Sequence, residues 1–226
     1  MLVSIGIAAV AIVVAAGIVI LLAKAGISPL LAGIGVTAVM AVELALAASG
    51  VLAAWNHVPP PMMLVVGGAI LIAVVTALSS VGTRVADRLS FALIIGYQSF
   101  RLPLELVMHR AASIGLMPEQ MSFSGWNFDI LTGVLAIPVA LLAARGRPSR
   151  GLIVAWNLTG TLLLANIVTI AVASLPMFAA FGPDRLNIWV AEPPYIWLPG
   201  VLVPAALFGH LLTWRKLARS ASVRAN

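Results

Sequence analysis

The sequence predicts an all-α integral membrane protein, a bundle of seven transmembrane helices with its N-terminus outside and its C-terminus in the cytoplasm. Hydrophobic residues make up 62% of the chain and charged residues only 9%, whereas soluble domains carry about 25% charged residues. Apolar runs of about 20 residues recur along the whole length, and each is long enough to cross about 30 Å of hydrocarbon. We therefore expect one transmembrane helical domain over residues 1–226, without a separate extramembrane domain.

Turn signals separate the apolar runs. Ser28-Pro29 starts the second run, Pro59-Pro60-Pro61 precedes the third, and residues 146–149 (Gly-Arg-Pro-Ser) link the fifth to the sixth. No Lys or Arg precedes the first apolar run, so we interpret it as an uncleaved helix and not as a secretory signal peptide. The expected spans are 2–23, 29–53, 61–81, 89–110, 128–144, 151–175 and 195–214.

The orientation follows from the basic residues between the spans. With seven crossings, the loops alternate between the two sides of the membrane. One side then collects Lys24, Arg84, Arg88, Arg145, Arg147, Arg150, Arg215, Lys216, Arg219 and Arg224. The other side collects only Arg110 and Arg185. Because cytoplasmic loops are enriched in Lys and Arg, the first side is predicted to be cytoplasmic.

The net charge of +6 does not indicate nucleic-acid binding. The basic residues form short clusters next to the spans, where anionic lipid headgroups attract them. The six Trp residues fall near predicted span ends, as interfacial anchors do. The lipid bilayer is therefore the expected partner, and nucleic acid is not.

The fourth span carries the most informative pattern. Gln98, Arg101, Glu105 and His109 occupy positions where a lipid-facing helix would carry Leu or Val. At about 100° per residue, these side chains fall within an arc of roughly 80°. Polar residues inside a membrane face protein, water or ligand, and so this stripe is the best candidate for a functional site.

An unpaired Arg at the bilayer centre costs roughly 3 to more than 10 kcal/mol. Glu105 follows Arg101 at i+4, and Glu43 lies at similar depth in the second span, so we expect Arg101 to pair with Glu105, Glu43 or both. Pro103 leaves the carbonyl of Ser99 without its usual donor and predicts a kink beside Arg101.

The same stripe predicts an outward-facing polar pocket. The fourth helix runs from the cytoplasm outward, and further polar side chains enter from the outer face or from the sixth span, where Thr159, Asn166 and Thr169 share a helix face. The candidate ligand-binding residues are Glu43, Gln98, Arg101, Glu105, His109, Asn127, Asp129 and Asn166. The alternative is a buried ion-pair network that only fixes helix packing.

Several chemistries lack the residues they need. The absence of Cys excludes thiolate metal sites and a Cys nucleophile. His57, His109 and Asp129 could form an outer metal site, but no HExxH-like spacing exists, and His210 is expected near the cytoplasmic end, too far away to join them. The seventh span has no Lys for a retinal Schiff base. We therefore predict no metal site and no catalytic residue, and the sequence leaves the cofactor unknown.

Four segments carry a resemblance: Phe100–His109, Gly115–Phe123, Asn127–Gly133 and Trp197–Pro204. Together they resemble a group of uncharacterised bacterial membrane proteins, known only as hypothetical proteins, over roughly the second half of the chain. The resemblance implies a multi-pass protein of the bacterial inner membrane. It does not indicate any particular activity.

Three functions remain open from the sequence. The first is binding or transport of a small molecule in the polar pocket, and an anionic molecule is one candidate. The second is an accessory or scaffold subunit of a larger membrane complex. The third is an intramembrane enzyme that acts on a lipid or prenyl substrate through Glu105, His109 or Asp129. The sequence favours a non-enzymatic function over this one.

Overall fold

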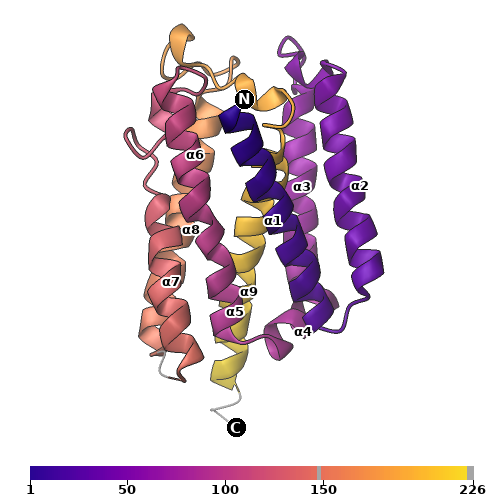
Figure 1. The fold of residues 1–226 in the computed structure, drawn as a ribbon, viewed down its shortest axis with the longest axis vertical. Coiled ribbons are helices and arrows are strands. Elements are labelled where there is room, and N and C mark those ends of the chain that lie inside the picture. Colours follow the sequence, from indigo (N-terminus) through magenta and orange to yellow (C-terminus); the bar gives the residue numbers. More distant parts are fainter. Residues whose placement is uncertain (147–148, 223–226) are drawn as a thin grey trace.

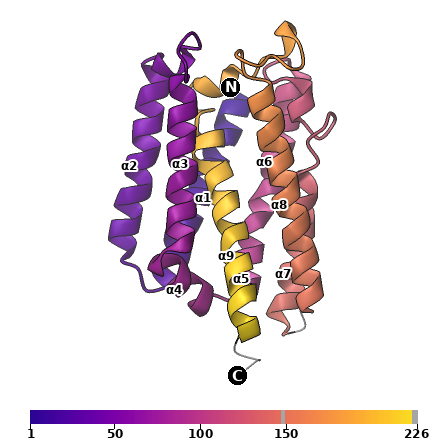
Figure 2. The ribbon, with the colours of Figure 1, turned by 180° about the vertical axis from the view of Figure 1, so that it is seen from behind.

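The computed structural model describes residues 1–146 and 149–222. Within these residues the chain forms nine α-helices and no strand. The long helices run side by side, and the N-terminus and the end of the last helix lie at opposite ends of the bundle (Figure 1; Figure 2 shows the reverse side). We call the end with the N-terminus the upper end and the other the lower end.

The first half of the chain contains three long helices and one short one. They are α1 (Leu2–Lys24), α2 (Pro29–Ala48), α3 (Pro61–Leu78) and α4 (Ser80–Arg88). Ser28 caps α2, since its side chain accepts a hydrogen bond from the Leu31 amide at 3.4 Å. The start of α2 at Pro29 and of α3 at Pro61 agrees with the turn signals in the sequence.

The fourth apolar run is an interrupted helix. It consists of α5 (Phe91–Tyr97), a 3₁₀ turn η2 (Gln98–Phe100) and α6 (Arg101–Ser113). Pro103 cannot donate a backbone hydrogen bond to the carbonyl of Ser99, which lies in this turn. The break is therefore at the place that the sequence predicted, directly before Arg101.

The second half contains helices of unequal length: α7 (Ile130–Ala144), α8 (Arg150–Ala173) and α9 (Val203–Ser222), which follows a π-helical turn η6 (Leu198–Leu202). The 15 residues of α7 span about 22 Å and the 24 residues of α8 about 36 Å. α7 therefore begins well below the upper end (Figure 1). Residues 114–129, which connect α6 to α7, descend along the side of the bundle to reach it (Figure 1).

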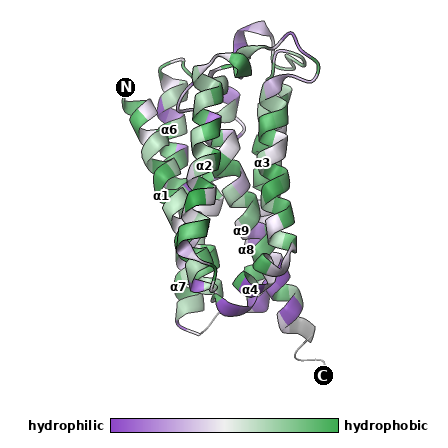
Figure 3. Ribbon diagram, turned by 90° about the vertical axis from the view of Figure 1, so that its right-hand side faces the viewer, coloured by the Kyte–Doolittle hydropathy of each residue, from purple (hydrophilic) through white to green (hydrophobic). Residues whose placement is uncertain are grey.

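Five helical segments are long and apolar enough to cross a membrane: Leu2–Lys24, Pro29–Ala48, Pro61–Leu78, Phe91–Ser113 and Arg150–Ala173. Large apolar side chains on their outer faces are exposed, for example Leu31, Leu64 and Leu71, each more than 60% exposed. Hydrophilic residues gather at α4 at the lower end and at the upper loops (Figure 3). These features are those of a membrane protein.

The structure corrects several span boundaries. The second helix ends at Ala48 and not at residue 53, because Gly50 adopts a positive φ of 77°. The third ends at Leu78, and residues 80–88 form the separate helix α4. The last helix continues to Ser222, eight residues beyond the expected end at 214. Arg147 and Arg224 of the predicted cytoplasmic set lie outside the described residues.

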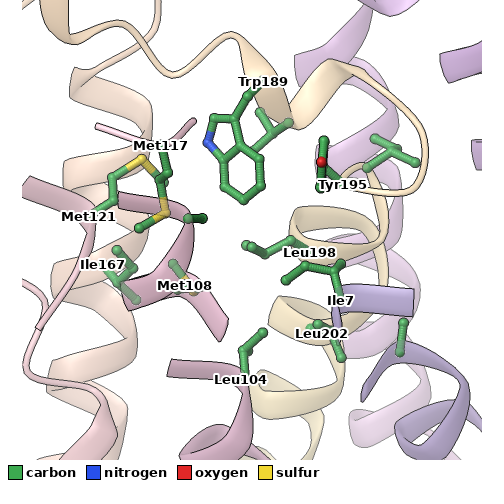
Figure 4. Close-up of a cluster of buried hydrophobic side chains, with 14 of the residues drawn as sticks. Ile7, Leu104, Met108, Met117, Met121, Ile167, Trp189, Tyr195, Leu198 and Leu202 are labelled. Carbon is green, nitrogen blue, oxygen red and sulfur yellow. The ribbon is translucent and has the colours of Figure 1, made fainter. Parts of the chain in front are cut away.

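The largest apolar core fills the upper half of the bundle. Ile7 of α1, Leu104 and Met108 of α6, Ile167 of α8 and Leu202 of η6 meet there (Figure 4). Trp189 and Tyr195, from the long loop before η6, close it from above with ring centroids 4.8 Å apart. The upper loops are thus packed onto the bundle.

The contact between α6 and α7 depends on Gly133. A Cβ atom there would lie 2.5 Å from the backbone nitrogen of Leu102 and 3.0 Å from the carbonyl carbon of Arg101. Gly133→Ala should therefore destabilise the protein by about 1–3 kcal/mol, measured as thermal unfolding in detergent. Gly68→Ala on α3 is the matched control, because no atom lies within 4 Å of its added Cβ. Equal stability of the two variants would contradict this packing.

Candidate functional site

Arg101 lies in the interior of the bundle, at the first position of α6. Its side chain is 2% exposed. Its Nη2 atom lies 2.5 Å from Oδ2 of Asp129 at the start of α7, and its Nη1 atom donates a hydrogen bond of 2.9 Å to Nε2 of His210 on α9. The Nη2 contact is close enough for an ion pair. Three helices thus converge on one guanidinium.

The contacts of His210 define its tautomer. A guanidinium can only donate, so Nε2 of His210 must accept from Arg101 and its proton must sit on Nδ1. Nδ1 lies 2.8 Å from Oδ1 of Asn157 on α8, which accepts that proton. Asn157 in turn donates through Nδ2 to the backbone oxygen of His210 at 3.2 Å. His210 is therefore a neutral imidazole that joins α6 to α8 through α9.

Gly160 makes room for this imidazole. A Cβ atom at Gly160 would lie 2.5 Å from Cε1 of His210. The indole ring of Trp156 lies beside the imidazole, with ring centroids 5.6 Å apart. The small residue on α8 thus allows α9 to bring His210 to the depth of Arg101.

On the other side, Asp129 is held by its own neighbours. Its Oδ1 accepts a hydrogen bond of 3.0 Å from the hydroxyl of Thr132, and its backbone amide donates to Oδ1 of Asn127 at 3.1 Å. Nδ2 of Asn127 lies 3.0 and 2.8 Å from the two carboxyl oxygens of Glu105. These contacts extend the network to a second carboxyl group.

We call the connected set of buried side chains the Arg101 cluster. It contains one guanidinium, two carboxyl groups, two amides and one neutral imidazole, and each member is at most 4% exposed. Its members are Arg101, Glu105, Asn127, Asp129, Asn157 and His210.

The expected partner of Arg101 was wrong, although the expectation of a buried ion pair was right. The salt bridge is with Asp129 and not with Glu105 or Glu43. From the sequence, Asp129 was expected near the outer face, where it could join His57 and His109 in a metal site. Because α7 is short, its first turn instead lies at the depth of Arg101.

Glu43 and Gln98 are buried, but neither forms a hydrogen bond or ion pair with the Arg101 cluster among the described residues. Glu43 of α2 packs against Gly200 in η6, since a Cβ atom at Gly200 would lie within 2.6 Å of its carboxyl group. Oε2 of Glu43 has no hydrogen-bond partner among the described residues. Nε2 of Gln98 donates to the backbone oxygen of Ala206 at 2.9 Å and so ties η2 to α9.

His109 and Asn166 contact the segment 114–129 and not Arg101. The ring of His109 stacks on Phe123 with centroids 4.4 Å apart, and its Nδ1 lies 3.1 Å from the hydroxyl of Ser122. Asn166 is exposed and donates to the backbone oxygen of Trp126 at 2.8 Å. The polar face expected on α8 is thus exposed, because Thr159 and Thr169 are exposed as well.

Sequence reasoning missed His210 and Asn157. His210 was expected near the cytoplasmic end because the predicted last span stops at residue 214. In the structure the last helix continues to Ser222, so His210 lies near the middle of the helical segment. The available signal was a single polar residue inside an otherwise apolar run. This signal, which drew attention to Arg101, applies equally to Asn157 in the sixth run.

Two clefts lie elsewhere in the bundle, and both have apolar linings. One of about 360 Å³ is bounded by α1, α2, α3 and α9, and one of about 230 Å³ lies between α3, α8 and η6. Neither is lined by a residue of the Arg101 cluster. Over residues 1–146 and 149–222, no three His, Asp or Glu side chains are grouped so that they could hold a metal ion.

A family model described as "Domain of unknown function (DUF8737)" matches residues 58–218, and the chain belongs to this family. The matched range includes every member of the Arg101 cluster. No curated protein and no solved structure matches the chain. The expectation of a family without an assigned activity is confirmed, and its bacterial setting stays a prediction.

The buried ion pair makes a prediction that a double-mutant cycle can test. Arg101→Met leaves a buried carboxylate unpaired and Asp129→Asn leaves a buried guanidinium unpaired, so each should cost about 3–5 kcal/mol of unfolding free energy. The double variant should cost much less than the sum. Denaturant unfolding in detergent micelles measures the three changes.

The matched control is the surface pair of Arg219 and Asp87, which are 50% and 45% exposed with atoms 2.6 Å apart. The cycle of Arg219→Met and Asp87→Asn should give a coupling below about 1 kcal/mol. A coupling between Arg101 and Asp129 no larger than that of the surface pair would refute the buried ion pair.

Proposed function

We propose that this chain is a seven-helix protein of the bacterial inner membrane that binds or transports a small molecule with an anionic group at the Arg101 cluster. The N-terminus is outside, and the cluster is reached from that side. One observation carries the proposal: a fully buried Arg101 is held by a single carboxylate at 2.5 Å. Ionisable groups buried within membrane helices are costly and commonly mark substrate or ion pathways.

The count of seven adds two segments to the five long apolar helices. α7 is a shorter apolar helix, and η6 with α9 forms a further helical segment over residues 198–222. The N-terminus and the end of α9 at opposite ends of the bundle fit an odd number of crossings (Figure 1). Basic residues at the lower end, such as Arg84, Arg88 and Arg215, favour a cytoplasmic lower end.

In the proposed binding step, the anionic ligand exchanges with the Asp129 carboxylate as the partner of Arg101. Asp129 already neutralises Arg101, and the carboxyl group of Glu105 lies in the same network. A free anion can therefore bind Arg101 only where it replaces the carboxylate of Asp129. Its hydrogen bonds would then come from a guanidinium that presents its donors in a fixed planar fork.

Access from the upper end requires movement of residues 114–129. This segment is held over the cluster by the contacts of His109 with Ser122 and of Asn166 with the Trp126 backbone. Nε2 of Gln120 adds hydrogen bonds to the Ser174 hydroxyl at 3.0 Å and to the Arg185 backbone at 2.9 Å. Release of these contacts would open a path to Asp129 and Arg101.

A proton-linked role is the second candidate. Glu105 contacts the Asn127 amide, Asn127 accepts from the backbone amide of Asp129, and the Asp129 carboxylate pairs with Arg101, which donates to His210 beside Asn157. The cluster thus contains two carboxyl groups against one guanidinium. Chains of acidic residues and His serve as proton relays in membrane proteins. Two results together would favour this candidate. The wild-type protein would take up protons without binding anions, and the variant Glu105→Gln would lose the proton uptake.

The exchange predicts chemical rescue. Asp129→Ala should lower the melting temperature, and formate or acetate should restore part of the loss by taking the place of the carboxylate beside Arg101. The double variant Arg101→Met/Asp129→Ala should show no response, because the binding cation is absent. Thermal unfolding in detergent, with chloride at equal ionic strength as the reference, measures the effect. An Asp129→Ala protein that carboxylates do not stabilise would rule out anion binding at Arg101.

The topology can be tested with single cysteines, since the chain has none. Asp184→Cys lies in an exposed upper loop and Ala218→Cys at an exposed position near the lower end. In intact cells a membrane-impermeant maleimide should label Asp184→Cys, and should label Ala218→Cys only after permeabilisation. The opposite labelling pattern would show that the orientation is the reverse of the proposed one. Labelling of both cysteines from the same side of the membrane would contradict an odd number of crossings.

A further inference from the structure

The cleft of about 360 Å³ is a side opening in the lower half of the bundle, which we call the lateral cleft. Its walls are α2 between Leu31 and Met40 and α3 between Ala69 and Thr76. α1 and α9 close its back. α2 packs mainly on α1 and stands apart from α3 (Figure 3), so the cleft opens sideways between α2 and α3. Exposed residues such as Leu31 and Ile72 border this opening.

The dimensions of the lateral cleft fit one hydrocarbon chain. Residues 31–40 of α2 cover about 14 Å along the helix axis, which is about half the hydrocarbon thickness of a bilayer and thus one leaflet. Over that length, 360 Å³ corresponds to a cross-section of roughly 25 Å². The lining is apolar apart from Thr76.

Two exposed basic residues lie at the lower end of the bundle, on helices next to the lateral cleft. Lys24 ends α1 two residues after the cleft residue Leu22, and its side chain is exposed. Arg84 is exposed on α4, which follows α3 directly and packs against it and against α1. Cationic side chains at a membrane surface attract anionic lipid headgroups.

We propose that the lateral cleft is a binding site for an anionic phospholipid of the lower leaflet. One acyl chain fills the cleft between α2 and α3. The phosphate group lies at the lower mouth, where Lys24 and Arg84 contact it. This site is separate from the Arg101 cluster and does not depend on the function proposed for it.

Gly35 offers a direct test, because it lines the lateral cleft and a Cβ atom there would meet nothing within 4 Å. Gly35→Leu fills the cleft with a side chain. Gly33→Leu is the matched control on the same helix, since its Cβ also meets nothing within 4 Å but Gly33 does not line the cleft. Both changes raise helix propensity equally, and equal melting temperatures would confirm that both variants fold.

Native mass spectrometry of the delipidated protein, titrated with phosphatidylglycerol or phosphatidylcholine, measures occupancy. The wild type and Gly33→Leu should bind one phosphatidylglycerol in preference to phosphatidylcholine, and Gly35→Leu should bind it at least tenfold more weakly. Lys24→Ala/Arg84→Ala should lose the preference between the two lipids, whereas Arg110→Ala, at the upper end, should keep it.

Unchanged phosphatidylglycerol binding by Gly35→Leu would overturn the proposal. Equal binding of the two lipids by the wild type would overturn its anionic part. A dimer that is present in the wild type and lost in Gly35→Leu would show that a second copy occupies the lateral cleft.

Discussion

The structure depends on how one guanidinium is kept in the interior of an apolar bundle. Arg101 contacts a carboxylate on α7 and an imidazole on α9, and the imidazole is fixed in turn by an amide on α8. Four helices therefore meet through polar contacts at a depth where lipid offers no alternative partner. Removal of one partner leaves the others buried and unpaired, and so the helices of this half cannot separate independently. The short α7 and the glycines at positions 133 and 160 follow from the same need, because they bring Asp129 and His210 within reach of Arg101.

The two halves of the bundle differ in how they are held together. α6 to α9 share the Arg101 cluster, whereas α2 is attached mainly through apolar contact with α1 and leaves an opening toward α3. The match to the family lies over residues 58–218 and so includes the whole polar half but not α1 and α2. The two proposed sites therefore differ in chemistry: an ionic one inside the bundle and an apolar one at its side.

The sequence predicted what depends on composition and local rules. Apolar run length located the long helices, Ser28-Pro29 and Pro61 marked helix starts, and Pro103 located the break before Arg101. The cost of a charge in hydrocarbon predicted a buried ion pair. The identity of its partner could not be predicted in this way, because it depends on how deep α7 begins. Asp129 is 28 residues from Arg101 in sequence, and its depth follows from the descent of residues 114–129. His210 was missed for a similar reason, since the depth of a residue depends on where its helix ends.

The most direct test of the account is nitrogen NMR of histidine-labelled and arginine-labelled protein in lipid bilayers, with His210→Gln used to assign the His210 signals. Because Arg101 can only donate, His210 must be neutral, with its proton on Nδ1 and its Nε2 unprotonated and close to the guanidinium of Arg101, 2.9 Å away. The predicted result is an Nδ1–H tautomer whose Nε2 is dipolar-coupled to the Arg101 guanidinium. An imidazolium, or an Nε2–H tautomer without that coupling, would contradict the buried Arg101 cluster on which the proposed function depends.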